Sequence, residues 1–449
     1  MVNKSVFGFT AVTLTALMIS ACGGGGGGGS DSSKNQTSLQ VYNVSPNSTA
    51  LKIEVGEDIT FSNLVYADAT STSTVDHGDY EIVVSGIDAS NEYEEVLSTS
   101  GSVAKDDRNL FIVSGDYNDI QFNSINFDLD DLEDDHLRLY VGDYSTGSTG
   151  YDMYLVSSGE GFSNAEKVTT TQYGQVGLVG DFSTETYDVY ITDTGTSDIV
   201  FTAERVSMTS GTSYFLMLRD TFGPGQAKFA LDRVTSSTLV VSYEDNYGDA
   251  QFRMLNAYPE TISTEIKNSE TNIKHSNIAA GDFTSYETVP YSDYGVTVDD
   301  SNGDQLLNNV LLSLPQNSTK AVAIYRDSDG NAKGIAFNES VRELTYQSDI
   351  NFINLAEDLE TVDVYFVADG GTIDTTPYHF KNSDFEQVKN SMLPTNDYQI
   401  TIIENRDDNT QIMVYQSPIF ELDDDKNYTY ALYKDASATY GYSLVVAAE

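Results

Sequence analysis

A tyrosine-led strand pattern recurs four times in this chain, and its spacing constrains the fold more than any other feature. The copies read GDYEIVV, ETYDVYI, SDYGVTV and NDYQITI, with their tyrosines at Tyr80, Tyr187, Tyr294 and Tyr398. Successive tyrosines lie 107, 107 and 104 residues apart. Apolar residues follow each tyrosine at alternate positions, a pattern typical of a strand buried on one face. A repeat of this length predicts four tandem domains.

Each tyrosine strand is flanked by further strand patterns. The segments that start at Leu39 (LQVYNVSPNSTALKIEV) and Gln251 (QFRMLNAYPETISTEI) each read as two alternating strands joined by a bend containing Asn and Pro. Roughly six or seven short strands in about 100 residues are typical of an antiparallel β-sandwich. The repeated tyrosine is similar to the tyrosine corner of immunoglobulin-like folds. We therefore predict an all-β protein made of four tandem immunoglobulin-like antiparallel β-sandwich domains.

The predicted sandwiches occupy residues 39–134, 135–248, 249–347 and 348–449. Each has about 100 residues, enough to bury a core of its own. The second repeat is the most divergent, because its bend, GDYSTGSTG, lacks the proline.

Several segments of these repeats also resemble a known family. NAYPE (256–260) and VDVYFV (362–367) match the bend and the second strand that open members of the bacterial domain-of-unknown-function family 4397. The resemblance extends over 39–84 and 251–298, includes the fourth repeat, and is weak in the second repeat. It implies a secreted or lipid-anchored envelope protein with tandem domains, and it assigns no catalytic residues.

The N-terminal segment has the pattern of a lipoprotein signal peptide. A lysine precedes an apolar stretch over 6–19, and small residues follow before Cys22, the only cysteine. This length is typical of a cleaved secretory signal, since a spanning helix needs about 20 apolar residues. Ile-Ser-Ala-Cys resembles the lipobox, whose cysteine carries more than one acyl chain and becomes the mature N-terminus. We predict a signal peptide over 1–21 and lipidation at Cys22; the alternative is a stray cysteine near a cleavage site.

Glycines and polar residues fill the segment after the cysteine. Residues 22–38 offer almost no apolar area to offset the entropy lost on ordering, so a flexible tether is expected there. Gly23, directly after Cys22, resembles the outer-membrane-sorted class of bacterial lipoproteins. The expected location is therefore the cell outer membrane, with the protein held by its lipid.

Charge and cysteine content exclude several classes of function. The chain has 69 acidic and 23 basic residues, a formal net charge of −46, which repels nucleic acid and anionic lipid heads. Such a surface is usually a solvated face, although a saline or cation-rich habitat fits it as well. With Cys22 lipidated, no thiol remains for a disulfide, a nucleophile or a zinc site.

No motif in the sequence indicates catalysis. The histidines stand singly, without the spacing of a metal site or a triad: His77, His136, His275 and His379. Neither a Gly-x-Ser-x-Gly elbow nor a phosphate-binding Gly-rich loop occurs. Carboxylates are so frequent that no single pair identifies an acid–base couple. The sequence thus predicts a protein without enzymatic activity or a required cofactor.

Three acidic turns are candidates for calcium. They are DLDDLEDDH (128–136), DDSNGDQ with Asp299, Asn302 and Asp304, and DSDGN with Asp327 and Asp329. Alternating acidic side chains supply the oxygen ligands that calcium prefers, but the twelve-residue EF-hand pattern is missing. Asn-Gly and Asp-Gly are also ordinary hairpin turns.

Two functions remain open. The first is a non-catalytic, lipid-anchored structural or binding protein that presents sandwich loops to a glycan, an envelope protein or another cell. The second is a carbohydrate-active enzyme or glycan-binding protein with a cryptic acidic site, since the 30 tyrosines offer stacking surfaces. Regular tyrosine positions in strands favour packing roles, and hence the first function.

Overall fold

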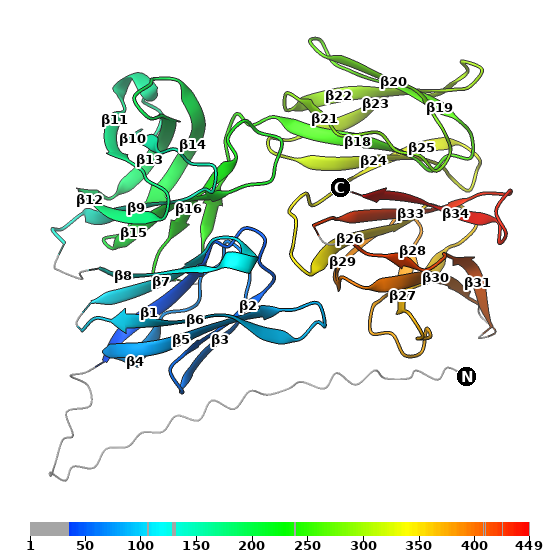
Figure 1. The fold of residues 1–449 in the computed structure, drawn as a ribbon. Coiled ribbons are helices and arrows are strands. Elements are labelled where there is room, and N and C mark those ends of the chain that lie inside the picture. The colour runs from blue at the N-terminus through cyan, green and yellow to red at the C-terminus, as the bar shows by residue number, and fades with distance from the viewer. Residues whose placement is uncertain are drawn as a thin grey trace, which may run out of the picture. The chain divides into compact units, whose positions relative to one another are not determined.

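The computed structural model describes residues 36–105, 107–127, 132–237, 239–406, 408, 410–423 and 425–448. Strands make up 61% of the structure and helix about 1%. The strands form four sandwich-like units in sequence, each with two sheets (Figure 1). The prediction of an all-β protein with tandem β-sandwiches is confirmed. Residues 1–21, Cys22 and the rest of the tether up to Asn35 lie outside the described residues.

The elements of each repeat follow in chain order. Repeat 1 contains β1 (Gln36–Asn43), β2 (Leu51–Val55), β3 (Ile59–Leu64), β4 (Ser73–Asp76), β5 (Gly78–Ile87), β6 (Tyr93–Val103), β7 (Arg108–Ser114), the 3₁₀ helix η2 (Tyr117–Asp119) and β8 (Gln121–Phe127). Repeat 2 contains β9 (His136–Tyr144), β10 (Tyr151–Ser157), the 3₁₀ helix η3 (Phe162–Asn164), β11 (Glu166–Thr170), β12 (Gln175–Ser183), β13 (Glu185–Asp193), β14 (Ile199–Met208), β15 (Ser213–Asp220), β16 (Phe229–Val234) and β17 (Val241–Tyr243).

The second half of the chain repeats this arrangement. Repeat 3 contains β18 (Ala250–Asn256), β19 (Ile262–Lys267), β20 (Asn272–Ile278), β21 (Glu287–Val289), β22 (Ser292–Asp300), β23 (Gln305–Leu314), β24 (Thr319–Arg326) and β25 (Ala332–Asn338). Repeat 4 contains β26 (Gln347–Asn354), β27 (Thr361–Ala368), β28 (His379–Asp384), β29 (Val388–Pro394), β30 (Asp397–Asn405), β31 (Gln411–Gln416), β32 (Phe420–Glu421), β33 (Tyr428–Lys434) and β34 (Tyr442–Ala448).

All four repeats share one strand order. In repeat 1 the sheets are β4-β1-β7-β8 and β3-β2-β5-β6, and the other repeats match them, with β17 added at one edge in repeat 2. The first strand pairs in parallel with the seventh, as in β1 with β7, while the other pairs are antiparallel. This order differs from the ABED and CFG sheets of immunoglobulin domains. We call the sheet with the parallel pair the parallel-pair sheet, and the sheet with the repeated tyrosine the tyrosine sheet.

The core of each sandwich lies between its two sheets. In repeat 3, alternate residues of β22 (Tyr294, Val296 and Val298) face alternate residues of β18 (Phe252 and Met254). The other three repeats have equivalent clusters of buried apolar side chains. The two-residue period of the sequence therefore corresponds to the inward face of the strands.

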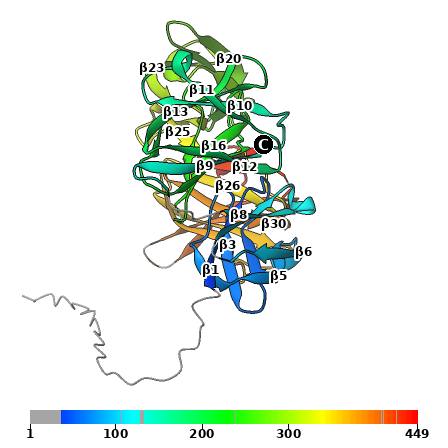
Figure 2. The same ribbon diagram turned by 90° about the vertical axis from the view of Figure 1, so that its left-hand side faces the viewer.

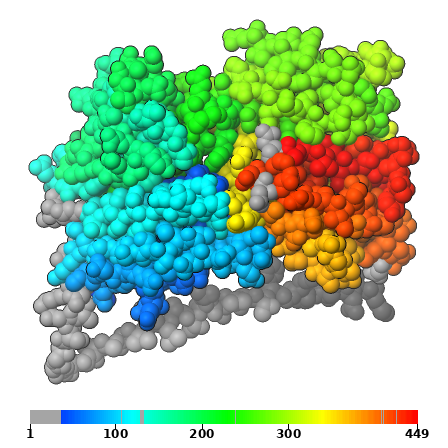
Figure 3. Space-filling model, in the orientation of Figure 1, coloured from blue at the N-terminus to red at the C-terminus, as the bar shows by residue number. Residues whose placement is uncertain are grey.

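The parallel-pair sheets are buried on both faces, because repeats pack together in two pairs. Repeats 1 and 2 share one apolar cluster and repeats 3 and 4 share another. Figure 2 shows β9, β12 and β16 above β1 and β8, and Figure 3 shows the two repeats of each pair in contact. Double burial explains why the seventh strands read as continuous apolar runs, such as Leu110–Val113 and Ala321–Tyr325.

The folded part begins earlier than the sequence predicts. Strand β1 starts at Gln36, so the last three residues of the expected tether (22–38) pair with neighbouring strands. Gln36 is the partner of Asp76 in β4, and the Thr37 hydroxyl donates to the carbonyl oxygen of Asp107. Strand β1 lies between β4 and β7, so these polar residues join the sheet through backbone bonds, which composition alone does not reveal. Among the described residues, no helix is long and apolar enough to cross a membrane.

Candidate functional site

The repeated tyrosines all make the same hydrogen bond. The hydroxyl of each donates to the carbonyl oxygen four residues earlier: Tyr80 to Asp76 at 2.7 Å, Tyr187 to Ser183 at 2.8 Å, Tyr294 to Pro290 at 2.5 Å and Tyr398 to Pro394 at 3.0 Å. The last three rings are buried and Tyr80 is half-buried. Burial raises the pKa of each of the four hydroxyls. These hydrogen bonds tie each tyrosine strand to the segment before it. The four tyrosines do not form a common site, because each belongs to a different repeat.

The calcium candidates sit in hairpin turns. Asp300 Oδ1 accepts hydrogen bonds from the amides of Asn302 at 2.8 Å and Asp304 at 2.9 Å, which closes the turn between β22 and β23. Asp327 Oδ1 does the same for Asp329 at 3.0 Å and Asn331 at 2.8 Å. These amides lower the pKa of both carboxyls. The carboxylate oxygens therefore act as turn acceptors.

No group of three or more acidic, histidine or cysteine side chains in the described part of the chain could hold a metal ion. Asp299 belongs to strand β22 and pairs with Gln305. Residues 128–131 of the first acidic turn lie outside the described residues. The structure thus favours the hairpin-turn interpretation for the two described turns.

The histidines are not brought together, because each belongs to a different repeat: His77, His136, His275 and His379. His275 is half-buried, with Nε2 3.4 Å from Glu287 Oε1 and Nδ1 3.3 Å from the Thr264 hydroxyl. The other three contact no common partner among the described residues.

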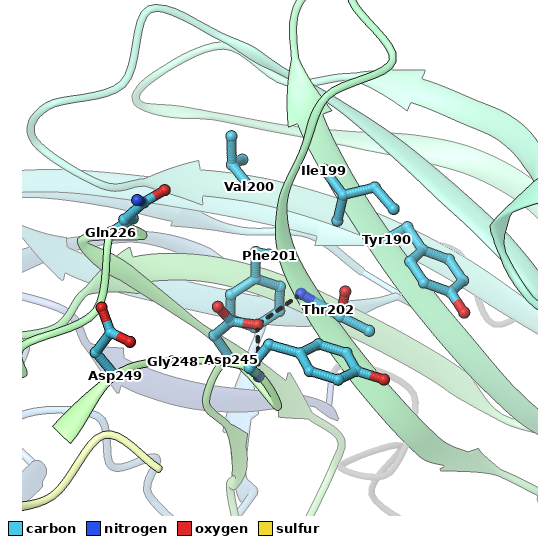
Figure 4. Close-up of a pocket in the computed structure, with 10 residues that line it drawn as sticks. Tyr190, Ile199, Val200, Phe201, Thr202, Gln226, Asp245, Gly248 and Asp249 are labelled. Carbon is cyan, nitrogen blue, oxygen red and sulfur yellow. Dashed lines mark hydrogen bonds between the residues drawn. The ribbon is translucent and has the colours of Figure 1, made fainter. Parts of the chain in front are cut away.

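A groove on repeat 2, with a volume of about 490 Å³, is a feature that the sequence did not indicate. Its floor is formed by β13 and β14, with Tyr190 and residues Ile199–Thr202. Its wall is the segment 244–249, which joins repeat 2 to repeat 3. In Figure 4, Gln226 and Asp249 lie at the end of the groove away from Tyr190. We call this feature the repeat 2 groove.

Hydrogen bonds fix the wall segment against β14. Asp245 Oδ1 accepts from the amides of Thr202 at 3.1 Å and Tyr247 at 3.2 Å (Figure 4). The backbone amide of Asn246 donates to the carbonyl oxygen of Thr202 at 2.9 Å. Asn246 Oδ1 accepts from the amide of Glu204 at 2.8 Å. The segment therefore continues the sheet edge like a short strand.

The wall is also held from repeat 3. Asn317 Nδ2 donates to the carbonyl oxygen of Asp245 at 2.8 Å, and the Asn317 amide donates to the carbonyl oxygen of Asp249 at 2.9 Å. A Cβ atom at Gly248 would lie 1.9 Å from Asn317 Oδ1, so glycine is required for this close approach. The groove is thus formed before any ligand arrives.

Two tyrosines, Tyr190 and Tyr247, line the repeat 2 groove together with Asp245 and Asp249. Tyr247 is 61% exposed, and its hydroxyl donates to Glu204 Oε1 at 2.8 Å, which holds the ring in place. This hydrogen bond and the charge of Glu204 raise the pKa of Tyr247. Burial raises the pKa of Asp245, as does the nearby charge of Asp249, although two amides act in the opposite direction.

A second hollow of about 460 Å³ adjoins the groove and shares Tyr190 with it. Its base contains Asp188, which accepts from the Ser158 hydroxyl at 2.9 Å and the amides of Gly159 and Arg205 at 2.8 and 2.9 Å. Burial alone would raise the pKa of Asp188, but these hydrogen bonds lower it. Phe162 packs against Tyr190 at 5.4 Å between ring centres, which extends the aromatic surface.

Part of this site could have been found in the sequence. Tyr190 lies in ETYDVYI at an outward position, because Tyr187 and Val189 face the core. An outward tyrosine on a central strand is a sign of an exposed ring. The positions of Tyr247 and Asp245 depend on how the segment between two repeats folds back, and no local pattern indicates that.

Comparisons with known proteins add little. No family model and no curated protein matches the chain. Among solved structures, the product complex of a multi-modular glycogen-degrading pneumococcal virulence factor is similar at 11% sequence identity and a TM-score of 0.17. The match covers 85% of this chain and only 38% of that one. A TM-score of 0.17 does not indicate that the two chains share a fold.

Proposed function

We propose that this protein is a non-catalytic binding protein of the bacterial cell envelope, held in the outer membrane by a lipid on Cys22, and that the repeat 2 groove binds a carbohydrate. The single observation that supports the binding role is the preformed groove with exposed Tyr247 and half-buried Tyr190 beside several carboxylates. Its wall is fixed from both repeats, so little ordering entropy would be lost when a ligand binds.

Carbohydrate is the ligand class that this chemistry suits. Sugar rings present apolar C–H faces and many hydroxyl donors. Tyrosine rings offer flat apolar faces with a polar tip, and ionised carboxylates accept hydrogen bonds only. The net charge of −46 disfavours anionic ligands, whereas a neutral or basic glycan meets no such repulsion.

The envelope location is supported by the lipobox-like sequence before Cys22 and by the resemblance to family 4397. Replacing Cys22 by serine should move the protein from the membrane pellet to the soluble fraction and leave its circular dichroism spectrum unchanged, because the anchor and the folded part are separate in sequence. Retention in the pellet would contradict the lipid anchor.

The groove is tested with a glycan array and two matched variants of the purified protein. Tyr247→Ala should weaken glycan binding about three- to tenfold, as expected for the loss of one aromatic contact. Tyr93→Ala is the control, since Tyr93 is 45% exposed on repeat 1 and lies outside the groove. Equal binding by both variants and the unmodified chain would rule out the groove as the carbohydrate site.

One observation favours a second candidate, a carbohydrate-active enzyme. A general acid needs a carboxyl whose pKa is raised, and the pKa of Asp245 is raised in the groove. Asp245 already accepts two amide hydrogen bonds as part of the wall, which is why we prefer a binding role. Release of reducing ends from a bound glycan, abolished in Asp245→Asn, would show the enzyme instead.

A further inference from the structure

The edge of the tyrosine sheet is interrupted in repeat 4 only. Its sixth strand runs without a break in the other repeats, as β6, β14 and β23. In repeat 4 it is divided into β31, which ends at Gln416, and the two-residue β32, and both pair with β30. Pro418 lies in the gap and has no amide hydrogen for a sheet ladder. The edge of the tyrosine sheet therefore has a gap at Pro418.

A cavity of about 290 Å³ opens at this interruption. It lies between β31 and β32 on one side and β34, the edge strand of the parallel-pair sheet, on the other. Four rings and two aliphatic side chains form most of its lining: Tyr415, Phe420, Tyr428, Tyr430, Leu444 and Val446. At the same place in repeat 3, where β23 is continuous, the space is only about 40 Å³. The larger volume thus distinguishes repeat 4 from repeat 3.

One residue that lines this cavity has a buried polar atom without a partner. Tyr430 is 1% exposed, and its hydroxyl makes no hydrogen bond to any described residue. Other tyrosines of the same core are satisfied, since Tyr398 donates to the carbonyl oxygen of Pro394 and the Tyr428 hydroxyl accepts from the amide of Asp423. Burial raises the pKa of Tyr430, so the hydroxyl keeps its proton. A buried hydroxyl without a partner is rare and costly in native proteins.

We propose that this cavity binds a small, uncharged, largely apolar molecule whose single hydrogen-bond acceptor accepts a hydrogen bond from the Tyr430 hydroxyl. The lining contains no charged side chain, so an ion would lose its hydration without compensation. The volume is about twice that of an engineered cavity of about 150 Å³ that binds benzene, which suits one aromatic ring with a carbonyl substituent. This site is separate from the repeat 2 groove and does not depend on the function proposed for it.

Two probes of almost the same shape test the proposal. Acetophenone and α-methylstyrene differ only in a carbonyl oxygen where the other has a CH₂ group. With the purified mature chain, calorimetry and saturation-transfer NMR should show that both bind and that acetophenone binds more tightly. Tyr430→Phe should reduce acetophenone affinity about three- to tenfold and change α-methylstyrene affinity by less than about twofold.

Two further variants distinguish binding inside the cavity from general effects of a core substitution. Val446→Phe places a ring at the cavity mouth and should abolish binding of both probes; Leu444→Phe takes its place if that variant does not fold. Tyr398→Phe removes a core hydroxyl that already has a partner, so the preference for acetophenone should persist. Absence of binding by both probes would overturn the site, as would binding that survives a folded cavity-filling variant. Equal affinity for the two probes would overturn the role of Tyr430.

Discussion

The two repeat pairs bury the same sheet in different ways. The interface of repeats 1 and 2 is filled by large rings, with Phe215 4.8 Å from Tyr140 and 4.7 Å from Phe127 between ring centres. The interface of repeats 3 and 4 contains small side chains, including Ala321 and Ala323. A shared topology therefore determines which face is covered, while the side chains that fill it can vary as long as the volumes on the two sides match.

Among the described residues, each pair of repeats also contains a buried ion pair between an arginine and a carboxylate, but the two differ in how completely the carboxylate is hydrogen-bonded. At the first interface, Asp232 Oδ2 accepts from Arg219 Nε at 2.8 Å and from the Tyr42 hydroxyl at 2.6 Å, while Oδ1 has no partner among the described residues. In the second pair, Arg253 donates to both oxygens of Glu339, at 2.9 and 2.7 Å. The second carboxylate is thus more completely hydrogen-bonded.

The Glu339 site gains further donors from both repeats. The Tyr286 hydroxyl donates to Glu339 Oε2 at 2.7 Å, and the Thr429 hydroxyl donates to Oε1. The Arg253 guanidinium lies 4.7 Å from the centre of the Tyr286 ring. Because Thr429 belongs to repeat 4 and the other residues to repeat 3, this network connects the two sandwiches.

The largest expected effect follows from separating the repeats of a pair. Fragment 36–134 would expose Tyr42, Leu110 and Ile112, which repeat 2 covers. Each large apolar side chain contributes roughly 1.5–3 kcal/mol when buried, so the interface contributes on the order of 10 kcal/mol. We expect 36–248 to fold as a monomer and 36–134 to aggregate or melt far lower, as measured by thermal circular dichroism and gel filtration. Equal melting temperatures for the two fragments would show that the pairs are not cooperative units.

The ion pairs provide the second test. Glu339→Gln leaves Arg253 charged and buried at 2% exposure, so we expect a loss of about 3–5 kcal/mol in unfolding free energy. Asp232→Asn should cost clearly less, because the new amide replaces an oxygen that has no partner. Urea unfolding of the full chain measures both. A larger loss for Asp232→Asn would reverse the ranking of the two networks.

The packing difference gives the third test. Phe215→Ala removes a ring from the first interface and should cost about 3–5 kcal/mol. Ala323→Leu adds volume to the second interface and should cost about 1–3 kcal/mol through overpacking. Ala203→Leu, in the core of repeat 2, is a control for overpacking away from any interface. If Ala323→Leu were neutral in urea unfolding, the second interface would have spare volume.

The smallest effect depends on pH. Burial raises the pKa of Tyr144, at the first interface, to about 12, whereas an unfolded tyrosine ionises near pH 10. Since the folded pKa is the higher one, this contribution to stability is present below pH 10 and is lost as the pH rises toward 12, by about 1.4 kcal/mol per pH unit. Tyr144→Phe should make the stability of 36–248 fall less steeply over this range. An unchanged slope would mean that the pKa of Tyr144 is the same in the folded and unfolded states.

The sequence was sufficient to predict local structure and the number of sandwiches. Alternating apolar residues after Tyr187 and Tyr294 identify strands with one buried face, and this is what the structure contains. The pairing of repeats was not predicted, although the continuous run Leu110–Val113 is typical of a strand buried on both faces. A run of apolar residues shows that both faces are covered but not which part of the chain covers them.

The candidate sites show the same limit. Pro418 within QSPIFEL could have indicated an interrupted edge strand, since proline cannot donate to the ladder. The cavity behind it depends on side chains from three other strands, including Tyr430 and Leu444. The repeat 2 groove depends on contacts between Asp245 and Asn317, which are far apart in the sequence. Such long-range arrangements leave no periodic signal.

Mutual covering of parallel-pair sheets restricts how an array of this kind can grow. A single additional copy would carry an apolar face with no counterpart, an exposed patch of the sort that promotes self-association. Duplication of two adjacent copies together supplies both halves of a new interface at once. The unit of inheritance in such arrays would then be the doublet, with even copy numbers retained, and an odd-numbered array would form dimers through its last member.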